Sequence, residues 1–382
     1  MKKRFLLFCL LASVQILSAC SLYKLTQNGK TIVGNNEDWF SPNSQIWFLP
    51  KGEKSYGVMH VGFINGFPQG GINEAGLMFD GFAMDYLAVT DTLGKIRTPL
   101  GEAVTHAMQS FDNVVSVKDY LQKINLSDLA TGMIVFVDRS GKYLIAEGDQ
   151  LIIGDDSERI FSNFYPSLTE TANIPFYQKG VEYINRSESE NSFDYCSSVM
   201  NAMQQDITQY STVYDLDKLT IRLYYFQDWK KYEEIDLIAE LKKGERAISI
   251  PELFPDNKSG TAYFTIYNDT KNSTAYLKNL FQENYSHLNG NDLENAKQGF
   301  ANYINIIGYE WLYDKKDTKG AIAIFKYGTE LIPNNANLFD SLGEAFYESK
   351  NYEAALKNYK QSLHLNPDNE NAIRIIKDLE NK

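Results

Sequence analysis

The stretches Ala19-Cys20-Ser21-Leu22-Tyr23 and Gly34-Asn35-Asn36-Glu37-Asp38-Trp39 decide how the first part of the chain folds and what chemistry it can perform. Cleavage of the bond before Cys20 would give this residue both a thiol nucleophile and a free α-amine. An α-amine has a pKa of about 7.7 to 8, close to the pH at which a general base is most effective. It could take the thiol proton directly or through a water, and later return it to a leaving amine.

A turn signal, Asn28-Gly29, lies between these two stretches and predicts an antiparallel hairpin. A two-residue loop sets Cys20 opposite Glu37 on the neighbouring strand. A three-residue loop, with Gly29 left-handed, sets it opposite Asp38 instead. Both registers place an acidic residue beside the Cys20 thiol.

Residues 1–19 have the pattern of an export signal. Three basic residues at positions 2–4 precede an apolar run from Phe5 to Leu17, and the small residues Ser18 and Ala19 follow. The run is too short for a permanent membrane anchor. We therefore expect an exported protein, periplasmic or extracellular, whose mature chain begins at Cys20.

The length and charge of the chain limit its domain number and its partners. At 382 residues it is long enough for two domains, each with its own core. Removal of residues 1–19 takes away three of the 37 basic residues, which leaves 34 against 49 acidic ones and a net charge of −15. Such a surface repels nucleic acid, so we expect no nucleic-acid partner. Two cysteines remain, Cys20 and Cys196, too few for a disulfide framework.

Residues 20–255 form the first predicted domain, in which strands and helices come in blocks. After the hairpin, strands are expected over 45–49, 56–63, 133–137, 143–147, 160–162, 211–216 and 219–226, and helices over 100–111, 117–124, 176–184 and 193–205. Strict alternation of strand and helix would favour a doubly wound parallel sheet. The blocks instead indicate the α+β class, with helices layered on antiparallel sheets.

Residues 256–272 are expected to be a linker, and residues 273–382 a helical domain. A 34-residue period runs through the helical part, with matching residues at 321 and 355, 325 and 359, 331 and 365, 333 and 367, and 335 and 369. This is the spacing of tetratricopeptide repeats, which stack pairs of helices. Such modules bind a protein partner or mediate self-association, and we expect one of these roles here.

Histidine is scarce in this chain, which limits the catalytic arrangements available. Of its four histidines only His60 and His106 precede the helical part, and neither has a partner motif for a Cys-His or Ser-His pair. We expect structural roles for both. No Cys and His cluster has metal-ligand spacing and no glycine-rich phosphate loop follows a strand, so neither a metal nor a cofactor is expected.

The chain resembles the N-terminal-nucleophile hydrolases of the choloylglycine hydrolase and penicillin acylase group, especially the acyl-CoA:6-aminopenicillanate acyltransferase branch. Cys20, the Gly34–Trp39 stretch, the segment Gly71-Ile72-Asn73-Glu74-Ala75-Gly76-Leu77 and Ser162-Asn163 carry the likeness. Its most specific part is the 18-residue separation of Cys20 and Asp38. The resemblance covers residues 20–254. It implies a four-layer αββα sandwich, and hydrolysis or transfer of the acyl group of a small linear N-acyl amide through a thioester on Cys20.

The resemblance also implies roles for individual residues. Cys20 would be nucleophile and base, Asp38 the partner of its amine, and Asn163 a donor in the oxyanion hole. Three positions depart from the pattern of the family. Asn35 stands where bile-salt and penicillin V hydrolases have Arg, and Ala83 stands where an oxyanion Asn is expected, which leaves only a backbone N–H there. Arg222, on a late strand, could replace a helix Arg that this chain lacks, although an exposed strand Arg is the simpler interpretation.

A competing interpretation assigns Cys20 to lipidation. Leu17-Ser18-Ala19-Cys20 matches the lipobox at which lipoproteins are cut and acylated. A surface lipoprotein with a degenerate enzyme domain and a partner-binding repeat module is therefore the alternative, and membrane association is expected only in that case. Lipoproteins usually begin with a flexible polar tether, whereas strand signals start here directly after Cys20. This difference favours the nucleophile interpretation.

Overall fold

The computed structural model describes residues 20–269 and 273–380. Among these residues the chain divides into two compact units, one ending at Phe264 and the other beginning at Thr265. The division falls inside the predicted linker 256–272, but most of that segment is helical, since α7 covers Lys258–Asn268. The predicted export signal, residues 1–19, lies outside the described residues.

The first unit contains two antiparallel sheets. The smaller has six strands in the order β10-β1-β2-β11-β12-β13. Their bounds are β1 Ser21–Gln27, β2 Lys30–Asp38, β10 Glu158–Ser162, β11 Thr208–Asp215, β12 Thr220–Tyr225 and β13 Glu233–Asp236.

The larger sheet has eight strands in the order β14-β3-β4-β5-β6-β7-β8-β9. Their bounds are β3 Ser44–Leu49, β4 Val58–Phe63, β5 Pro68–Asn73, β6 Met78–Ala83, β7 Gly132–Val137, β8 Tyr143–Glu147, β9 Gln150–Gly154 and β14 Arg246–Ser249. Apart from β14, this sheet follows chain order, so each strand pairs with the next one along the sequence.

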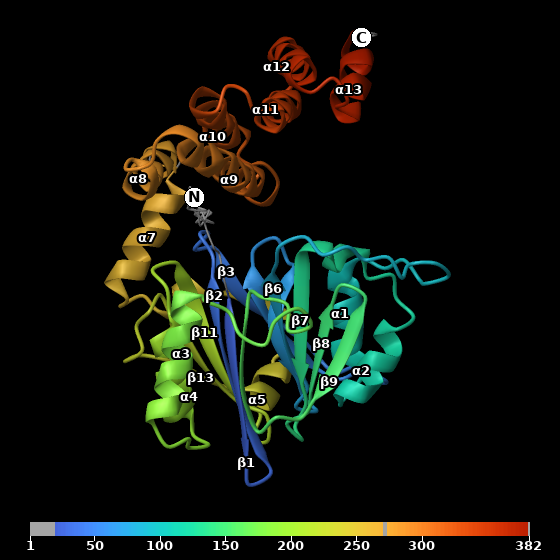
Figure 1. The fold of residues 1–382 in the computed structure, drawn as a ribbon, viewed down its shortest axis with the longest axis vertical. Helices are drawn as coiled ribbons and strands as arrows, with labels where there is room; N and C mark the ends of the chain where they lie inside the picture. The colour runs from blue at the N-terminus through green and yellow to red at the C-terminus, as the bar shows by residue number, and fades with distance from the viewer. Residues whose placement is uncertain (1–19, 270–272, 381–382) are drawn as a thin grey trace, which may run out of the picture. The chain divides into compact units, whose positions relative to one another are not determined.

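The two sheets pack face to face, and a pair of helices covers each outer face (Figure 1). The helices α1 (Leu100–Ser110) and α2 (Val114–Leu121) lie on the eight-stranded sheet, and α3 (Pro175–Arg186) and α4 (Phe193–Met203) on the six-stranded sheet. Alternate side chains of each strand point to opposite faces. One set fills the core between the sheets and the other packs under the helices. The structure therefore has four layers, in the order helix, sheet, sheet, helix.

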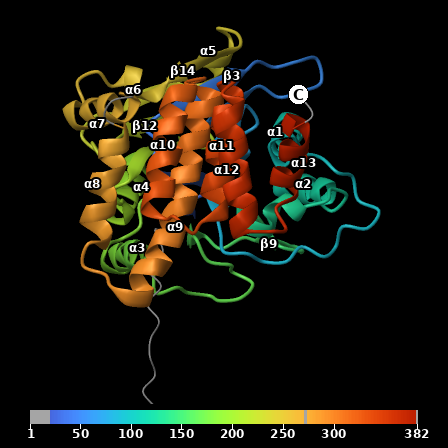
Figure 2. The same cartoon turned by 90° about the horizontal axis from the view of Figure 1, so that it is seen from above.

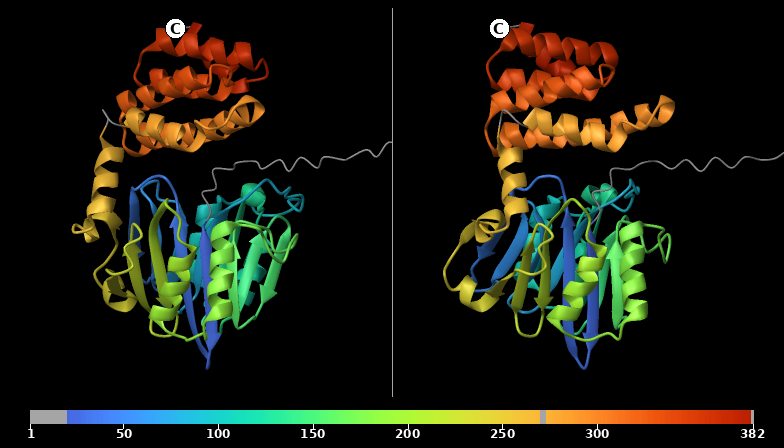
Figure 3. Two further views of the ribbon diagram at one scale, coloured as in Figure 1. Left: turned by 60° about the vertical axis from the view of Figure 1, so that its left-hand side comes forward. Right: turned by 90° about the vertical axis from the view of Figure 1, so that its left-hand side faces the viewer.

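The hairpin of β1 and β2 has the two-residue loop. Gln27 pairs with Lys30, and both loop residues are left-handed, with φ of 54° at Asn28 and 73° at Gly29. Two left-handed residues make the type I′ turn, whose twist matches that of the strands. The turn projects beyond the neighbouring strands (Figure 3). This register sets Cys20 opposite Glu37, the first of the two expected alternatives.

Short elements complete the first unit. They are the 3-10 helix Ser127–Thr131 and the helices α5 (Leu237–Leu241) and α6 (Ile250–Leu253). A close approach of α4 to β2 explains one glycine: a Cβ at Gly34 would lie 2.7 Å from Cγ of Met200 and 2.8 Å from Sγ of Cys196. Any larger residue at this position would push α4 away from the sheet that carries Cys20.

The second unit is helical. Its elements are α8 Ser273–Tyr285, α9 Gly290–Tyr309, a π-helical turn Glu310–Asp314, α10 Thr318–Leu331, α11 Ala336–Glu348, α12 Tyr352–Leu365 and α13 Glu370–Glu380. The helices α9 to α12 lie side by side in chain order (Figure 2). In this part of the chain the predicted 34-residue period is structural, because α10 and α12 begin 34 residues apart and so do α11 and α13.

Matching N-caps mark the same period. Asp317 accepts a hydrogen bond from the Gly320 N–H at the start of α10, and Asn351 accepts one from Ala354 at the start of α12. The caps of the other two helices, Asn335 and Asn369, are likewise 34 residues apart and bond the N–H three residues on. Each cap satisfies a backbone donor that the first turn of a helix leaves free. In the part of the chain that the structure describes, no helix has both the length and the apolar character needed to cross a membrane.

Candidate active site

Cys20 lies at the start of β1, between two neighbouring strands. Because Ser21 pairs with Asn36 of β2 on one side and with Ser162 of β10 on the other, Cys20 is flanked by Glu37 and by Asn163. Its side chain joins that of Leu22 in the core between the sheets and is 5% exposed. The hydroxyl of Ser162 donates to the Cys20 carbonyl at 3.3 Å. The start of β1 is thus held from both sides.

Glu37 faces Cys20 from β2, and its carboxyl is almost fully buried, with 3% of the residue exposed. Burial is the main cause that raises the pKa of this carboxyl to about 8, and the charge of Asp38 raises it further. Hydrogen bonding to the Cys20 thiol and the Tyr210 hydroxyl acts in the opposite direction. Near neutral pH the protonated form of Glu37 is therefore well populated, and a proton is held beside the thiol.

Asp38 is fixed by two side chains from the segment before and at the start of β11. The Gln205 amide donates to Oδ2 at 2.5 Å, and the Thr208 hydroxyl donates to Oδ1. Burial raises the pKa of Asp38 to about 7, although both hydrogen bonds favour the charged form and lower it. Neither Gln205 nor Thr208 was expected from the sequence. Both lie in the stretch before the strand predicted at 211–216, and only tertiary structure brings them to Asp38.

Asn163, which lies across from Cys20, contacts Ala83 of β6. The Asn163 amide nitrogen donates to the Ala83 carbonyl at 2.6 Å. An Asn amide has two N–H groups, so one remains for another acceptor. Between β6 and β7, the backbone N–H of Met84 donates to the carbonyl of Thr131. In an antiparallel ladder, the adjacent residues Ala83 and Gly132 then form a non-hydrogen-bonded pair. The backbone N–H of Ala83 therefore points away from β7, on the same side as its carbonyl.

Asn35 lies on the inner face of β2, two residues before Glu37. Its amide donates to Oδ1 of Asp80 on β6 at 3.1 Å, and its own oxygen accepts from the Thr212 hydroxyl. Asp80 is fully buried, and burial followed by the charge of Glu37 raises its pKa. Asn35 thus links the two sheets below Cys20. Asp80 was not expected from the sequence, although an acid inside the apolar strand Met78–Ala83 is a signal that could have identified it.

The thiol of Cys20 is protonated in these surroundings. Burial is the largest cause that raises its pKa, and the charges of Glu37, Asp38 and Asp80 raise it further, while a hydrogen bond from the Asp38 backbone lowers it. A thiolate is the reactive form of cysteine. The site therefore needs a positive charge or a base next to Cys20 before the thiol can react.

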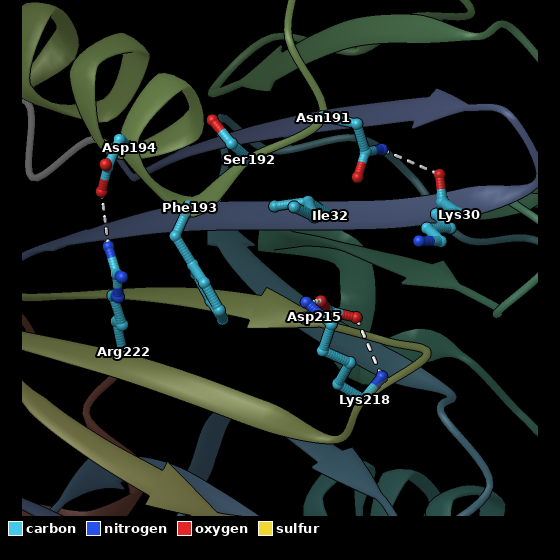
Figure 4. Close-up of a pocket in the computed structure, with 9 residues that line it drawn as sticks. All are labelled: Lys30, Ile32, Asn191, Ser192, Phe193, Asp194, Asp215, Lys218 and Arg222. Carbon is cyan, nitrogen blue, oxygen red and sulfur yellow. Dashed lines mark hydrogen bonds and ion pairs between the residues drawn. The ribbon is translucent and has the colours of Figure 1, made fainter.

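Arg222 lies on the other face of the sheet, so its expected place at the site is wrong. It pairs with Val213, whose side chain packs under α3 and α4, whereas its neighbours Ile221 and Leu223 point into the core that holds Cys20. Arg222 instead binds Asp194 at 2.6 Å at the start of α4 (Figure 4). It also stacks on the Phe193 ring, 4.6 Å from its centre.

The surface pocket around Arg222 is lined by cations, two of which are paired with acids of the protein. It has a volume of about 270 Å³ and includes Lys30, Lys218 and Asp215 (Figure 4). Lys218 pairs with Asp215 at 3.4 Å, as Arg222 does with Asp194. Two of the cations of the pocket, Lys218 and Arg222, thus have acidic partners within the protein, and the pocket is separated by the sheet from Cys20.

The two histidines of the first unit also lie away from Cys20. His60 is buried on the outer face of β4 between Trp47 and Phe79, with ring centres 5.5 and 5.9 Å away, and burial lowers its pKa to about 4. His106 lies on α1, next to Tyr120. Among the described residues no group of His, Cys, Asp and Glu is arranged to hold a metal ion.

Comparisons with known proteins give structural likenesses but no sequence match. Neither a protein-family model nor a curated protein matches the sequence. Among solved structures, that of a penicillin V acylase from Agrobacterium tumefaciens is similar, with 16% sequence identity and a TM-score of 0.43. The match covers 57% of this chain and 87% of the acylase chain. The chemistry of the site has to be inferred from its own residues.

Proposed function

We propose that the first unit is an N-terminal-nucleophile amidohydrolase or acyltransferase that cleaves a linear amide C–N bond through a thioester on Cys20. One observation carries the proposal: the first strand begins at a cysteine flanked by acidic residues on one neighbouring strand and by Asn163 on the other. The histidines of the first unit lie elsewhere, so we assign the role of base to another group. A free α-amine on Cys20 would be that base, and it requires cleavage of the Ala19–Cys20 bond.

In the acylation step, the α-amine takes the thiol proton and the thiolate attacks the carbonyl carbon of the substrate amide. The developing oxyanion accepts hydrogen bonds from the second N–H of Asn163 and from the backbone N–H of Ala83. The ammonium, held by Asp38, then returns the proton to the substrate nitrogen. The C–N bond breaks, the amine leaves, and the acyl group remains as a thioester on Cys20.

In the second step, the α-amine takes a proton from the acceptor, which attacks the thioester carbonyl. Water as acceptor gives a carboxylic acid, and a second amine gives a new amide. The C–S bond breaks, and the thiol regains its proton from the ammonium. Both outcomes use the same residues, so the proposal covers hydrolysis and transfer.

The architecture agrees with this chemistry. Four layers in the order α, β, β, α, with the nucleophile at the start of an inner strand, are what the family resemblance implies. For the second unit we propose a tetratricopeptide-like module, based on its 34-residue period and matching caps, that binds a protein partner or a second copy of the chain. Export to the periplasm or the exterior is part of the same proposal, because the cut before Cys20 would occur on export.

Lipidation of Cys20 remains the competing candidate because of the lipobox sequence. The position of the thiol supports the nucleophile proposal instead. A lipidated cysteine must reach a bilayer, usually through a polar tether, whereas Cys20 is buried and leads directly into β1. Lipidation would therefore require the start of β1 to leave the core between the sheets.

Capture of the acyl-enzyme tests the proposal. The chain 20–382 would be incubated with a panel of N-acyl amino acids, bile-salt conjugates and penicillin V, quenched with acid and digested. We expect at least one substrate to release its amine and to add its acyl mass to the peptide that begins at Cys20, in a form that hydroxylamine removes. Amine release with the acyl group on any other residue would refute the assignment of the nucleophile.

A further inference from the structure

Three buried carboxyl groups surround Cys20, and two of them are not explained by the proposed reaction. Glu37 and Asp38 come from β2 of the six-stranded sheet, and Asp80 comes from β6 of the eight-stranded sheet. All three interact electrostatically with Cys20. The two sheets thus direct three acids toward the residue at which the mature chain would begin.

The two unexplained acids each have an oxygen without a hydrogen-bond partner among the described residues. Asp38 has a donor on each oxygen, from Gln205 and Thr208. In contrast, Oε2 of Glu37 and Oδ2 of Asp80 are buried and unpartnered. Native structures rarely leave a buried carboxyl oxygen unsatisfied, because such a group gives up its hydration without compensation. Both oxygens therefore indicate a donor that the described residues do not supply.

No described cation compensates the cluster. The titratable groups that face it are the Cys20 thiol from β1, the carboxyls themselves from β2 and β6, and the hydroxyls of Tyr210 and Tyr214 from β11. Within the described ranges, none of the groups that shift the pKa values of these acids is a Lys, Arg or His. Buried carboxylates without a neighbouring cation are strongly disfavoured, so Glu37 and Asp80 favour their protonated forms in these surroundings.

We propose that Glu37 and Asp80, with Asp38, form the buried counter-charge of the α-ammonium group that cleavage before Cys20 creates. The inference rests on the proposed function in one respect, that the Ala19–Cys20 bond is cut. The new ammonium is bonded to the Cα of the residue that all three acids face, and its three N–H groups are donors. Glu37 and Asp80 are then positioning residues for the amine, and cleavage completes the site electrostatically.

The proposal predicts how stability depends on pH. In the uncleaved chain the folded-state pKa values of Glu37 and Asp38, about 8 and about 7, lie above their ordinary values of 4.5 and 3.8. The folded state then binds more protons than the unfolded state, so stability is full below about pH 4 and is lost as the pH rises toward 8. An ammonium beside the acids lowers their pKa values and removes most of this loss.

The test compares two chains that contain all described residues, one beginning at Cys20 and one retaining Ser18-Ala19. Hydrogen exchange of peptides from β2, measured by mass spectrometry at pH 5 and pH 8, reports the local stability of the site. The two chains are compared at the same pH, so the intrinsic exchange rate of the amides is the same in both. We expect a much smaller difference in protection at pH 5, since most of the loss occurs at higher pH. At pH 8 we expect exchange about tenfold slower or more in the chain beginning at Cys20, since one pKa unit corresponds to a factor of 10.

The double variant Glu37→Gln, Asp80→Asn keeps the shape of both side chains and removes their charge. In this double variant, the exchange rates of the two chains at pH 8 should differ by less than about threefold, because two of the three charges that interact with the ammonium are absent. The matched control Asp215→Asn, a buried acid at the far end of β11, should leave the difference intact.

Equal protection of the two wild-type chains at pH 8 would overturn the proposal, even if the double variant fails to fold. Amine release measured on the same chains reports the proposed function separately, so failure of one can be told from failure of the other.

Discussion

Replacement of Cys20 by alanine should abolish acyl release from whichever N-acyl amide the mature chain cleaves. The thiol forms the covalent bond to the acyl group, and the neighbouring Ser21 side chain points to the opposite face of the strand. Loss of a nucleophile that acts as one unit with its base typically costs about 10⁴-fold or more in kcat. We expect kcat of Cys20→Ala to fall by at least about 10⁴-fold, measured as release of the free amine.

Cys196→Ala is the matched control for this variant. Cys196 is the other cysteine of the described chain, is buried on α4, and lies on the opposite face of the six-stranded sheet. We expect it to retain activity within about threefold, since its thiol lies in the apolar cluster beneath α3 and α4 and takes no part in the proposed chemistry. Unchanged turnover in a correctly folded Cys20→Ala protein would refute the thioester mechanism, because no acyl-enzyme could then form at this position.

A chain that retains Ser18-Ala19 should be nearly inactive although its thiol is intact. In that chain the Cys20 nitrogen belongs to a peptide bond and cannot act as a base. General bases contribute about 10² to 10⁴ in rate, so we expect kcat/KM to fall by at least about 10²-fold relative to the chain beginning at Cys20. The measurement is amine release at pH 7.5 from both chains at equal concentration.

The pH dependence distinguishes loss of the base from loss of the fold. If only the base is missing, activity of the extended chain should rise with pH as hydroxide ionises the thiol, since burial and three acids raise the pKa of Cys20. Equal activity of both chains across pH 6 to 9 would show that the α-amine is not the base. A group from elsewhere in the chain would then have to take the thiol proton.

The centre of the six-stranded sheet was predictable from the sequence, whereas the central strand β5 of the larger sheet and most of the edge strands were not. The strands from 45–49 to 219–226 were predicted with shifts of a few residues, because their side chains are apolar on at least one face. The edge strands β9, β13 and β14 were missed. They read Gln-Leu-Ile-Ile-Gly, Glu-Glu-Ile-Asp and Arg-Ala-Ile-Ser, which are short and partly polar because an edge strand faces water on one side.

The hairpin of β1 and β2 shows that a local sequence signal can predict a turn without fixing the register of the strands. Asn28-Gly29 predicted the turn, but two registers remained possible until the structure placed both residues at positive φ. In the same way, chain order could not show which residues meet Cys20 from distant segments. Asn163 and Ala83 were expected together from a family likeness, while Asp80, Gln205 and Thr208 were found only in the folded chain.

Arg222 illustrates why a single charged residue on a predicted strand is a weak indicator of a site. Neighbouring residues of a strand point to opposite faces, so a site assignment depends on knowing which face is buried. The apolar residues Ile221 and Leu223 on either side of Arg222 already indicated that it faces away from the core between the sheets. That alternation was available in the sequence and outweighs the chemical suitability of Arg.

The central claim is that Cys20 is a free N-terminal nucleophile, and the mass of the N-terminal peptide tests it most directly. The protein would be purified from the cells that produce it, with the soluble and membrane fractions kept separate, and its N-terminal peptide analysed by mass spectrometry. We predict a peptide that begins at Cys20, with a free amine and a free thiol. A peptide whose Cys20 carries a diacylglyceryl thioether or an acylated amine would contradict the claim, as would a chain still joined to Ala19.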